Sequence, residues 1–451
     1  MKKSKKLSLS TTHIIMLSFV CAVAVGSILL SLPFSSATGR SVPYIDALFT
    51  AVTSTCVTGL VTVTTAETWS IFGQAVILLL IQAGGLGIIT VMSGIMLMVN
   101  KKLGLNDRVL VQDAFNLNTL SGLSAFVKKV FAGTALIEGI GALLYMTVFV
   151  PEFGVRGIWI SVFNSVSAFC NAGIDIIGAD SLCSYVTNPI INSVTCALII
   201  MGGIGYIVWW DVIRVVKKHR GSRAFRFLTL QSKIAIVSTA VLILSGAFLI
   251  FIFEYGNSCV TGNFNIFEKI QFSLFQSVTT RTAGFATVPQ ENLTESSALV
   301  CLVLMFIGGS PVGTAGGIKT VTFAVLAVTA FSAIRNKNST EVFSRSISVR
   351  TVRKALSVAL MSFGIMAAST LLLSAVTDAD TLDVLYETVS ATATVGLTRN
   401  LTGSLDTAGK IIIMLTMYLG RVGPISLAVA FNLRKENLNT VRCPEEEISV
   451  G

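Results

Sequence analysis

The stretch TSTCVTGL, residues 53–60, is the first of four similar segments that set the plan of this chain. The other three are SAFCNAGI at residues 167–174, VTTRTAGF at residues 278–285 and ATATVGLT at residues 391–398. Each is rich in Ser, Thr and small residues and leads to one glycine: Gly59, Gly173, Gly284 and Gly396, spaced 114, 111 and 112 residues apart. Because a quarter of the 451 residues is about 113, one internal repeat accounts for nearly the whole chain.

The composition places these repeats in a membrane. Hydrophobic residues make up 53% of the chain and charged residues 12%, whereas about a quarter of a soluble globular chain is charged. This excludes a soluble enzyme. The net charge of +10 is explained by basic residues that flank apolar spans, and not by nucleic-acid binding.

Each repeat has the same order: a long apolar segment, a short segment that runs into the glycine, and a second long apolar segment. The first apolar segments cover residues 13–32, 126–150, 233–254 and 354–376, and the second cover residues 70–99, 190–216, 297–334 and 409–433. The short segments are too short to cross a bilayer and are predicted to be re-entrant: residues 43–55, 157–169, 266–280 and 382–393.

We therefore predict an all-α polytopic membrane protein with eight transmembrane helices and four pore loops around a central pore. Its four helix–re-entrant loop–helix repeats are predicted at residues 1–104, 105–220, 221–340 and 341–451, the last with a C-terminal tail. Two spans per repeat make all repeats run in the same sense, so they enclose one pathway. Many secondary transporters have inverted repeats instead.

The distribution of charge predicts the orientation. The N-terminus, the three linkers between repeats and the C-terminus together carry a net charge of +17, whereas the loops that flank the glycine segments carry −8. By the positive-inside tendency, both termini and all linkers are predicted to be cytoplasmic, and the glycine segments enter from outside.

The four glycine segments favour a cation site. A dehydrated cation needs fixed oxygens, which backbone carbonyls in an unusual conformation supply, and glycine permits such conformations. Each loop follows a short helix whose partly negative C-terminal end points inward. Asp46 and Asp383 each lie thirteen residues before their glycine, where a carboxylate suits the positive end of the short helix. The alternative, that these glycines merely end helices, does not explain four at a near-constant period.

The third repeat predicts a gate. Its second apolar segment contains Gly308, Gly309, Ser310, Pro311, Gly313, Gly316 and Gly317, and such a run cannot continue a stable helix. Non-helical backbone at membrane depth persists where it is buried in protein or lines a cavity. We predict an intramembrane gating loop at about residues 308–319. For the related runs GGLG, residues 84–87, and GGIG, residues 202–205, close helix packing is a sufficient explanation.

Three ionisable residues are predicted within the membrane, where charge is costly and by default suggests function. Arg421, at the depth of the glycine cluster, is predicted to hold the gate loop; the alternative is a packing arginine. Lys319 either bonds the loop or snorkels to the membrane surface. Glu138 is expected to pair with a neighbouring helix in preference to coordinating an ion. Arg281, three residues before Gly284, is expected to brace its loop from behind.

The motifs CVTG, CNAG, RTAG and TVG on a fourfold helix–loop–helix plan resemble the Trk/Ktr/HKT superfamily of potassium transporters, and the length is most similar to the membrane subunits of bacterial Ktr systems. The resemblance implies sodium-stimulated K⁺ uptake through a filter of four strands, with K⁺ bound only there. The corresponding residues are Val57, Thr58, Gly59, Asn171, Ala172, Gly173, Thr282, Ala283, Gly284, Thr394, Val395 and Gly396. In plant relatives a serine at the first filter glycine accompanies sodium preference, so Gly59 favours potassium.

The resemblance also implies partners and location. It implies a homodimer with one pore per protomer in the bacterial plasma membrane, and a cytoplasmic nucleotide-binding regulatory ring of the KtrA type. The chain itself has no P-loop and needs no cofactor for this role, so nucleotide control would come from the partner, and we expect no enzyme activity.

Two alternatives remain open from the sequence. A proton- or sodium-coupled secondary transporter of another small solute predicts intramembrane carboxylates around a substrate cavity, of which only Glu138 is a candidate. An intramembrane hydrolase needs paired catalytic residues, and the two histidines, His13 and His219, form no such set. The eight cysteines contain no CxxC pair; Cys183 and Cys259 fall in predicted outer loops, and the sequence does not establish a bridge between them.

Overall fold

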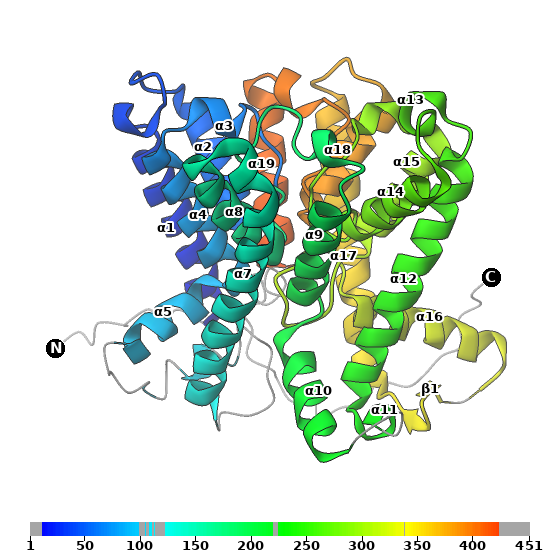
Figure 1. Cartoon of the computed structure of the whole chain (residues 1–451). Coiled ribbons are helices and arrows are strands. Elements are labelled where there is room, and N and C mark those ends of the chain that lie inside the picture. Colours follow the sequence, from blue (N-terminus) through cyan, green and yellow to red (C-terminus); the bar gives the residue numbers. More distant parts are fainter. Residues whose placement is uncertain are drawn as a thin grey trace.

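The first helix of each repeat forms a long upright rod (Figure 1). The computed structural model describes residues 11–98, 104, 108–110, 112, 122–219, 224–337 and 339–423. Among these residues, four single helices are long and apolar enough to cross a membrane: α1 (Thr11–Leu30), α7 (Leu123–Phe153), α12 (Leu230–Glu254) and α17 (Val349–Ser374). They match the four predicted first segments within a few residues.

The re-entrant segments form short helices at the predicted places. These pore helices are α2 (Tyr44–Cys56), α8 (Val155–Cys170), α14 (Ile266–Thr279) and α18 (Thr381–Ala393). Asp46 and Asp383 lie in the first turns of α2 and α18, as predicted. Each also forms an ion pair, Asp46 with Lys410 at 2.7 Å and Asp383 with Arg399 at 2.6 Å.

The second helix of each repeat begins at a polar N-cap whose side chain accepts a backbone N–H: Ser70, Asn188, Thr294 and Asp406. Such caps satisfy donors that the first helical turn leaves free. The helices that follow these caps are α4 (Ile71–Leu86), α9 (Pro189–Gly203), α15 (Glu295–Phe306) and α19 (Thr407–Val422).

The second helices of the first two repeats are bent, which corrects the prediction of continuous spans. Helix α4 continues into α5 (Ile88–Met98) at an angle of 98°, and α9 into α10 (Tyr206–Lys218) at 95°. The breaks fall at Gly87 and Gly205, with φ of 85° and 94°, a range that L side chains rarely adopt. In the third repeat α15 and α16 (Thr320–Ile334) are separated by the predicted loop.

Short elements connect these helices. The helical ones are α3 (Thr65–Thr68), α11 (Ala224–Phe227), α13 (Ser258–Thr261), η1 (Pro33–Ser35), η2 (Cys183–Tyr185), η3 (Gln290–Asn292) and η4 (Thr402–Ser404). A two-stranded antiparallel hairpin, β1 (Glu341–Val342) and β2 (Arg345–Ser346), pairs Glu341 with Ser346.

The repeats close into a ring. The upper part of the second helix in each repeat contacts the pore helix of the next: α4 with α8, α9 with α14, α15 with α18, and α19 with α2. Each first helix also packs against the pore helix of its own repeat. The pore helices are therefore surrounded by longer helices, and the largest buried side chains include Phe49, Phe163, Phe275 and Tyr386 from all four of them.

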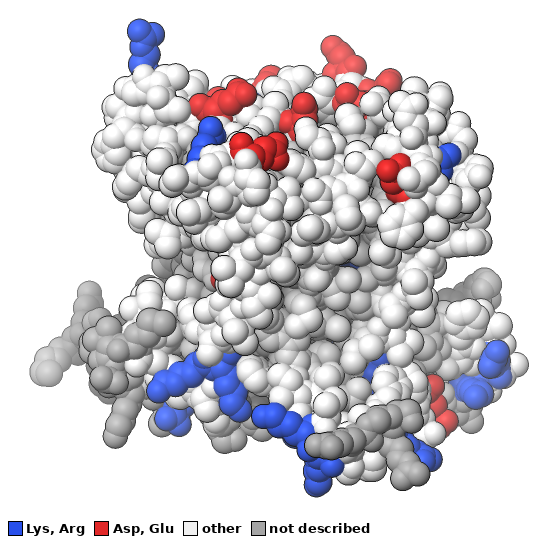
Figure 2. All heavy atoms as spheres, in the orientation of Figure 1, with Lys and Arg blue, Asp and Glu red and all other residues white. Residues whose placement is uncertain are grey.

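The charges separate to the two ends of the molecule (Figure 2). Acidic side chains gather at the upper end and basic side chains at the lower end, in the pattern that the sequence predicts. Beside the four single helices, the bent pairs α4–α5 and α9–α10 are each long and apolar enough to be one membrane span. The described residues thus give up to six candidate spans, and the count of eight stays a prediction. Residues 1–10 and 424–451, on which the predicted orientation of the termini depends, lie outside the described residues.

Candidate functional site

The four repeat glycines meet at the centre of the ring. All have positive φ: 100° at Gly59, 64° at Gly173, 82° at Gly284 and 100° at Gly396. A Cβ atom added to any of them would collide with the carbonyl oxygen of the residue before the next glycine: Ala172, Ala283, Val395 and Thr58, in turn. Each strand thus packs backbone against backbone on its neighbour, which only glycine permits, and the predicted filter segments are brought together.

The residue two positions before each glycine is also left-handed. Val57, Asn171, Thr282 and Thr394 have φ of 56°, 58°, 65° and 52°, and all four are buried. Left-handed backbone is unfavourable for such residues, above all the β-branched ones, and persists only where surrounding contacts impose it. The chain therefore turns sharply from each pore helix into an extended strand.

Buried hydroxyls hold these strands against their pore helices. The Gly59 N–H donates to Thr53 Oγ1 and the Gly396 N–H to Ser390 Oγ, both at 3.0 Å. In the other two repeats the hydroxyl donates to the carbonyl after the glycine: Ser167 to Ile174, and Thr279 to Phe285 at 2.6 Å.

The role of these four hydroxyls in holding the filter strands was not predicted from the sequence. Their signal is positional, since a Ser or Thr precedes the glycine by six residues in three repeats and by five in the third. The pore-helix aromatic residues show the same offset, since Phe49, Phe163 and Tyr386 lie ten residues before their glycines and Phe275 lies nine before Gly284.

Residues 307–319 connect α15 to α16, include the gating loop predicted at about 308–319, and are folded on themselves. Ile307 and Ile318 form an isolated parallel bridge, and the Thr320 N–H donates to the Gly309 carbonyl at 2.9 Å. The hydroxyls of Ser310 and Thr320 lie 2.8 Å apart. Two residues of the loop have positive φ, Val312 at 63° and Gly317 at 64°.

The loop docks on the break between α9 and α10. Its Ser310 and Thr314 N–H groups donate to the carbonyls of Gly203 and Gly202 at 2.8 and 3.1 Å, and the Tyr206 N–H donates to Val312 at 3.0 Å. The expectation that close helix packing suffices to explain the GGIG run of the second repeat is therefore wrong. The run ends a helix and exposes carbonyls that receive the loop.

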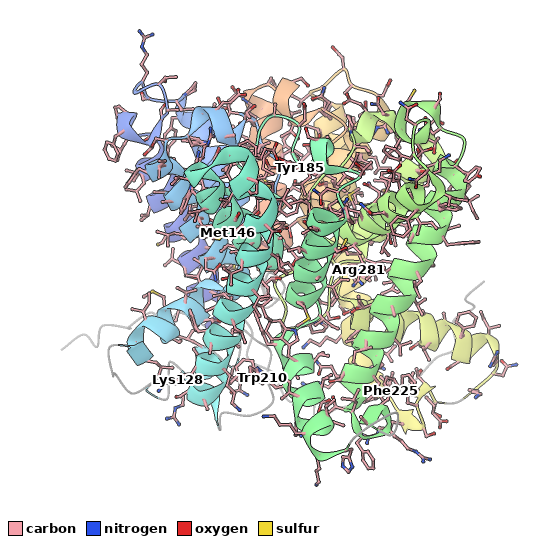
Figure 3. All side chains as sticks on the ribbon, viewed as in Figure 1. Lys128, Met146, Tyr185, Trp210, Phe225 and Arg281 are labelled. Carbon is pink, nitrogen blue, oxygen red and sulfur yellow. The ribbon has the colours of Figure 1, made fainter. Side chains whose placement is uncertain are left out.

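Three basic side chains are attached to the loop. Lys319 Nζ donates to the Ala315 carbonyl at 2.6 Å. Arg421 donates to the Thr314 carbonyl at 2.8 Å and to the Gly84 carbonyl of the first repeat. Arg281, which lies inside the bundle (Figure 3), donates to the Thr239 carbonyl of α12 at 3.3 Å and to the Gly308 carbonyl at 3.2 Å.

These contacts bear on the alternatives left open by the sequence. The bond from Lys319 to Ala315 favours attachment to the loop over snorkelling. Each of the three side chains donates to backbone carbonyls of, or directly beside, the loop, so their charges are satisfied at membrane depth by neutral dipoles. In the GGLG run of the first repeat, the Gly84 carbonyl is one of these acceptors.

A cavity of about 1010 Å³ lies below the loop. Its lining includes Gly316 and Lys319 of the loop, Arg421, Thr90 after the first break, and Ser348 at the start of α17. The loop borders both this cavity and the fourth filter strand, because Gly316 lines the cavity and an added Cβ atom on it would collide with the Thr394 hydroxyl.

The buried acids have partners in neighbouring elements. Gln82 Nε2 of α4 donates to Glu138 Oε2 at 3.3 Å, which confirms the predicted pairing across helices. Cys170, the last residue of α8, donates to Gln82 Oε1 at 3.4 Å. In α18, Glu387 accepts the hydroxyl of Thr398 at 2.6 Å and that of Thr402. Sequence reasoning missed Glu387 because nothing in the pattern distinguishes it from a surface acid of the outer loops.

The cysteines and the other acids give no sign of a metal or redox centre among the described residues. No group of three or more His, Cys, Asp or Glu side chains that could hold a metal ion occurs in that part of the chain. Cys183 and Cys259 are both free thiols. Burial, and then the nearby Asp180 carboxylate, raise the pKa of the Cys183 thiol to about 12, which keeps it protonated and unreactive at neutral pH.

Known proteins are similar to this chain in sequence and in fold. The signature of the TrkH family, described as a cation transport protein, matches residues 1–441. The chain is 38% identical to the Ktr system potassium uptake protein B of Bacillus subtilis (97% of this chain and 96% of that protein). It is 37% identical to the potassium/sodium uptake protein NtpJ of Enterococcus hirae (100% and 99%). The crystal structure of the potassium transporter TrkH from Vibrio parahaemolyticus superimposes with a TM-score of 0.76 at 15% identity, covering 96% of this chain and 87% of that chain.

Proposed function

The chain belongs to the TrkH family of cation transport proteins, and on that premise we propose that it is the ion-translocating subunit of a potassium uptake system with sodium involvement. The names of two full-length relatives, a potassium uptake protein and a potassium/sodium uptake protein, support this substrate assignment. The proposal is for transport across a membrane, with K⁺ as substrate and Na⁺ as activator.

The closed ring of four glycines carries the proposal. Carbonyls packed around an axis replace the hydration shell of a cation, and the pore helices direct their partly negative C-terminal ends to the same place. Such a ring of backbone carbonyls suits a dehydrated cation and offers no pocket for an organic substrate. We assign the filter, and K⁺ binding there alone, to Val57, Thr58, Gly59, Asn171, Ala172, Gly173, Thr282, Ala283, Gly284, Thr394, Val395 and Gly396.

We assign the gate to the loop below the ring. Its glycines, Ser310 and Pro311 form non-helical backbone held by side chains from two other repeats, and it borders both the cavity and the fourth filter strand. Lys319 and Arg421 hold it closed through carbonyl contacts. Deleting residues 309–315 tests this assignment, because a gate deletion raises K⁺ flux and unchanged flux contradicts it.

The charge pattern and the relatives support a proposal for the cellular setting of the chain. A basic lower end suits a cytoplasmic face and an acidic upper end suits the outside of a bacterial plasma membrane. With both termini in the cytoplasm, the basic linkers face a compartment where a nucleotide-binding regulatory ring can dock. The Ktr system name of a relative fits a multi-component assembly, and we propose a homodimer of this chain as its membrane part.

The alternative of a secondary transporter for another solute gains no support from the intramembrane acid. Glu138 is engaged with Gln82 and lies behind the second filter strand, beside Cys170, and not on the lining of the cavity below the gate. A carboxylate in that place serves the scaffold of the filter.

Growth on limiting potassium tests the function. Three K⁺-uptake-deficient strains are compared. The first carries this chain alone, the second carries it with a candidate cytoplasmic partner, and the third carries the Gly59→Ser variant. The unsubstituted chain is expected to restore growth at low K⁺, and Gly59→Ser to reduce it, because a side chain at φ of 100° displaces the Ala172 carbonyl. Absence of rescue contradicts K⁺ uptake, and rescue unaffected by Gly59→Ser contradicts the filter.

A further inference from the structure

The gate loop touches the filter directly. The Thr314 hydroxyl donates to the Phe169 carbonyl at 2.9 Å, and Asn171 Oδ1 shares the same proton at 3.0 Å. Phe169 is in the last turn of α8, and Asn171 is the left-handed residue of the second filter strand. Thr314 and Asn171 are separated by 143 residues in the sequence, and both are buried.

The third and fourth strands have equivalent contacts. The Gly316 N–H donates to Thr282 Oγ1 at 3.1 Å, and Thr282 is the left-handed residue of the third strand. The Thr394 hydroxyl, from the left-handed residue of the fourth strand, lies against Gly316 without space for a Cβ atom between them. Two neighbouring loop residues, Thr314 and Gly316, therefore contact the same position in three successive filter strands.

The first strand is supported differently. A Cβ atom on Gly84 would meet the Thr55 carbonyl and a methyl group of Val57. The carbonyl of Gly84 in turn accepts from Arg421. The left-handed residue of this strand therefore rests on α4, and Arg421 joins α4 to the loop.

These contacts act on residues that need support. A left-handed Thr is strained unless its surroundings impose the conformation. The dihedrals at these positions, Asn171 included, orient the carbonyls of the filter strands. Opening the loop far enough to pass an ion separates Thr314 from Asn171 and Gly316 from Thr282. The same movement then frees the second and third strands to relax.

We propose that Thr314 and Gly316 are positioning residues of the ion filter, so that the filter has its K⁺-selective geometry only while the gate loop is closed. This rests on the proposed filter and gate. Loop opening weakens K⁺ binding and assists release, and by reciprocity K⁺ in the filter stabilises the closed loop. The loop is then a wall of the filter as well as a barrier below it.

Matched threonine variants separate these two roles of the loop. Thr314→Val removes the hydroxyl at nearly constant shape, Thr314→Ser keeps it, and Thr320→Val breaks the bond of the loop to Ser310 without touching the filter. K⁺ and Na⁺ binding to the purified full-length chain is measured by isothermal titration calorimetry, and K⁺ flux in proteoliposomes.

We expect Thr314→Val to lower the ratio of K⁺ to Na⁺ affinity about tenfold, the effect of about 1.4 kcal/mol. Thr314→Ser keeps the ratio. Thr320→Val removes a bond within the loop and leaves the contacts of Thr314 and Gly316 with the filter in place, so it is expected to keep the ratio. If Thr314→Val does not fold, Thr282→Val against Thr282→Ser makes the same comparison from the filter side.

The outcomes separate this inference from the function on which it rests. An unsubstituted chain that binds no K⁺ at a saturable site overturns the filter assignment. A K⁺-binding chain in which Thr314→Val raises flux with an unchanged ion ratio leaves filter and gate in place and overturns the coupling between them. An equal loss of the ratio in Thr314→Val and Thr320→Val also overturns it, because the specific contact is then irrelevant.

Discussion

At the scale of single residues, the filter strands depend on hydroxyls that the glycine pattern alone does not reveal. Thr53 and Ser390 accept the N–H of their glycine, whereas Ser167 and Thr279 donate to the carbonyl after it. The first two fix the glycine itself and the second two fix the outer end of the strand. The ring thus has two kinds of support, with the two accepting strands, of repeats one and four, next to each other.

Thr53→Val removes the acceptor of the Gly59 N–H. An unsatisfied buried donor costs about 1 to 3 kcal/mol, so we expect K⁺ affinity to fall about tenfold as the first strand relaxes. The K⁺ concentration that gives half-maximal uptake measures this. Thr53→Ser retains the oxygen and is the matched control; equal behaviour of the Val and Ser variants contradicts the assignment.

Glu387 supports the fourth strand beyond its glycine through Thr398 and Thr402. Glu387→Ala leaves two buried or half-buried hydroxyls without their acceptor, and we expect the free energy of unfolding to fall by about 2 kcal/mol. Glu387→Gln presents an oxygen and an amide to hydroxyls that can accept as well as donate, so it is expected to retain most of the stability. Thermal unfolding in detergent compares the two, and an Ala variant as stable as the Gln variant refutes the role.

The positions of the filter residues could be predicted from the sequence because the glycines recur at a fixed period. Their backbone conformation could not, since the left-handed residues two positions earlier are Val, Asn, Thr and Thr, and three of these are β-branched residues that normally avoid this conformation. Tertiary contacts impose that conformation. The partners of Asp46 and Glu138 were likewise hidden, because Lys410 and Gln82 lie far away in the sequence.

At the scale of elements, interruptions in the second helices receive the gate. The Gly87 and Gly205 breaks turn α5 and α10 away by more than a right angle from α4 and α9. The loop at 307–319 docks at the second of these breaks, where its N–H groups donate to the carbonyls of Gly202 and Gly203. The sequence indicated the third interruption because five glycines and one proline within residues 308–317 exclude a stable helix there. It did not indicate the other two, because GGLG and GGIG are compatible with close helix packing.

Gly205→Ala is expected to displace the gate loop. Gly205 has φ of 94° and an added Cβ atom would collide with the Pro311 carbonyl, and such strain costs of order 1–3 kcal/mol. A shift of that size changes the population of open loop about tenfold, so K⁺ flux without an activating partner is expected to rise. Proteoliposome flux measures it.

Gly203→Ala is the matched control two residues away. Its Cβ atom would meet Ala315 and Asn171 at 3.6 Å, an ordinary contact distance, and the residue is helical. Flux is expected to stay close to that of the unsubstituted chain. If both variants behave alike, the loop does not depend on the geometry of the Gly205 break.

At the scale of the whole molecule, four non-identical repeats close a ring because the last one contacts the first. The contacts of α4 with α8, α9 with α14 and α15 with α18 join repeats that follow each other in sequence, whereas the contact of α19 with α2 joins the two ends of the chain. The Lys410–Asp46 ion pair lies in this last interface, and both side chains are mostly buried, with 15% and 12% exposure.

Breaking the Lys410–Asp46 ion pair should weaken the interface of α19 with α2, which joins the last repeat to the first. Lys410→Met leaves the Asp46 carboxylate without its partner in a mostly buried site, and we expect a loss of about 2 kcal/mol of unfolding free energy, between the values typical of surface and buried pairs. Reversing the pair with Asp46→Lys and Lys410→Asp should recover only part of the lost stability, because a lysine at the start of α2 opposes the helix dipole.

A double-mutant cycle on thermal stability in detergent measures the coupling energy between Asp46 and Lys410, expected at about 1 kcal/mol or more. Since burial limits screening, the coupling should persist at high salt. Additive effects of the two single substitutions on thermal stability would show that only the apolar contacts of α19 with α2 stabilise this interface.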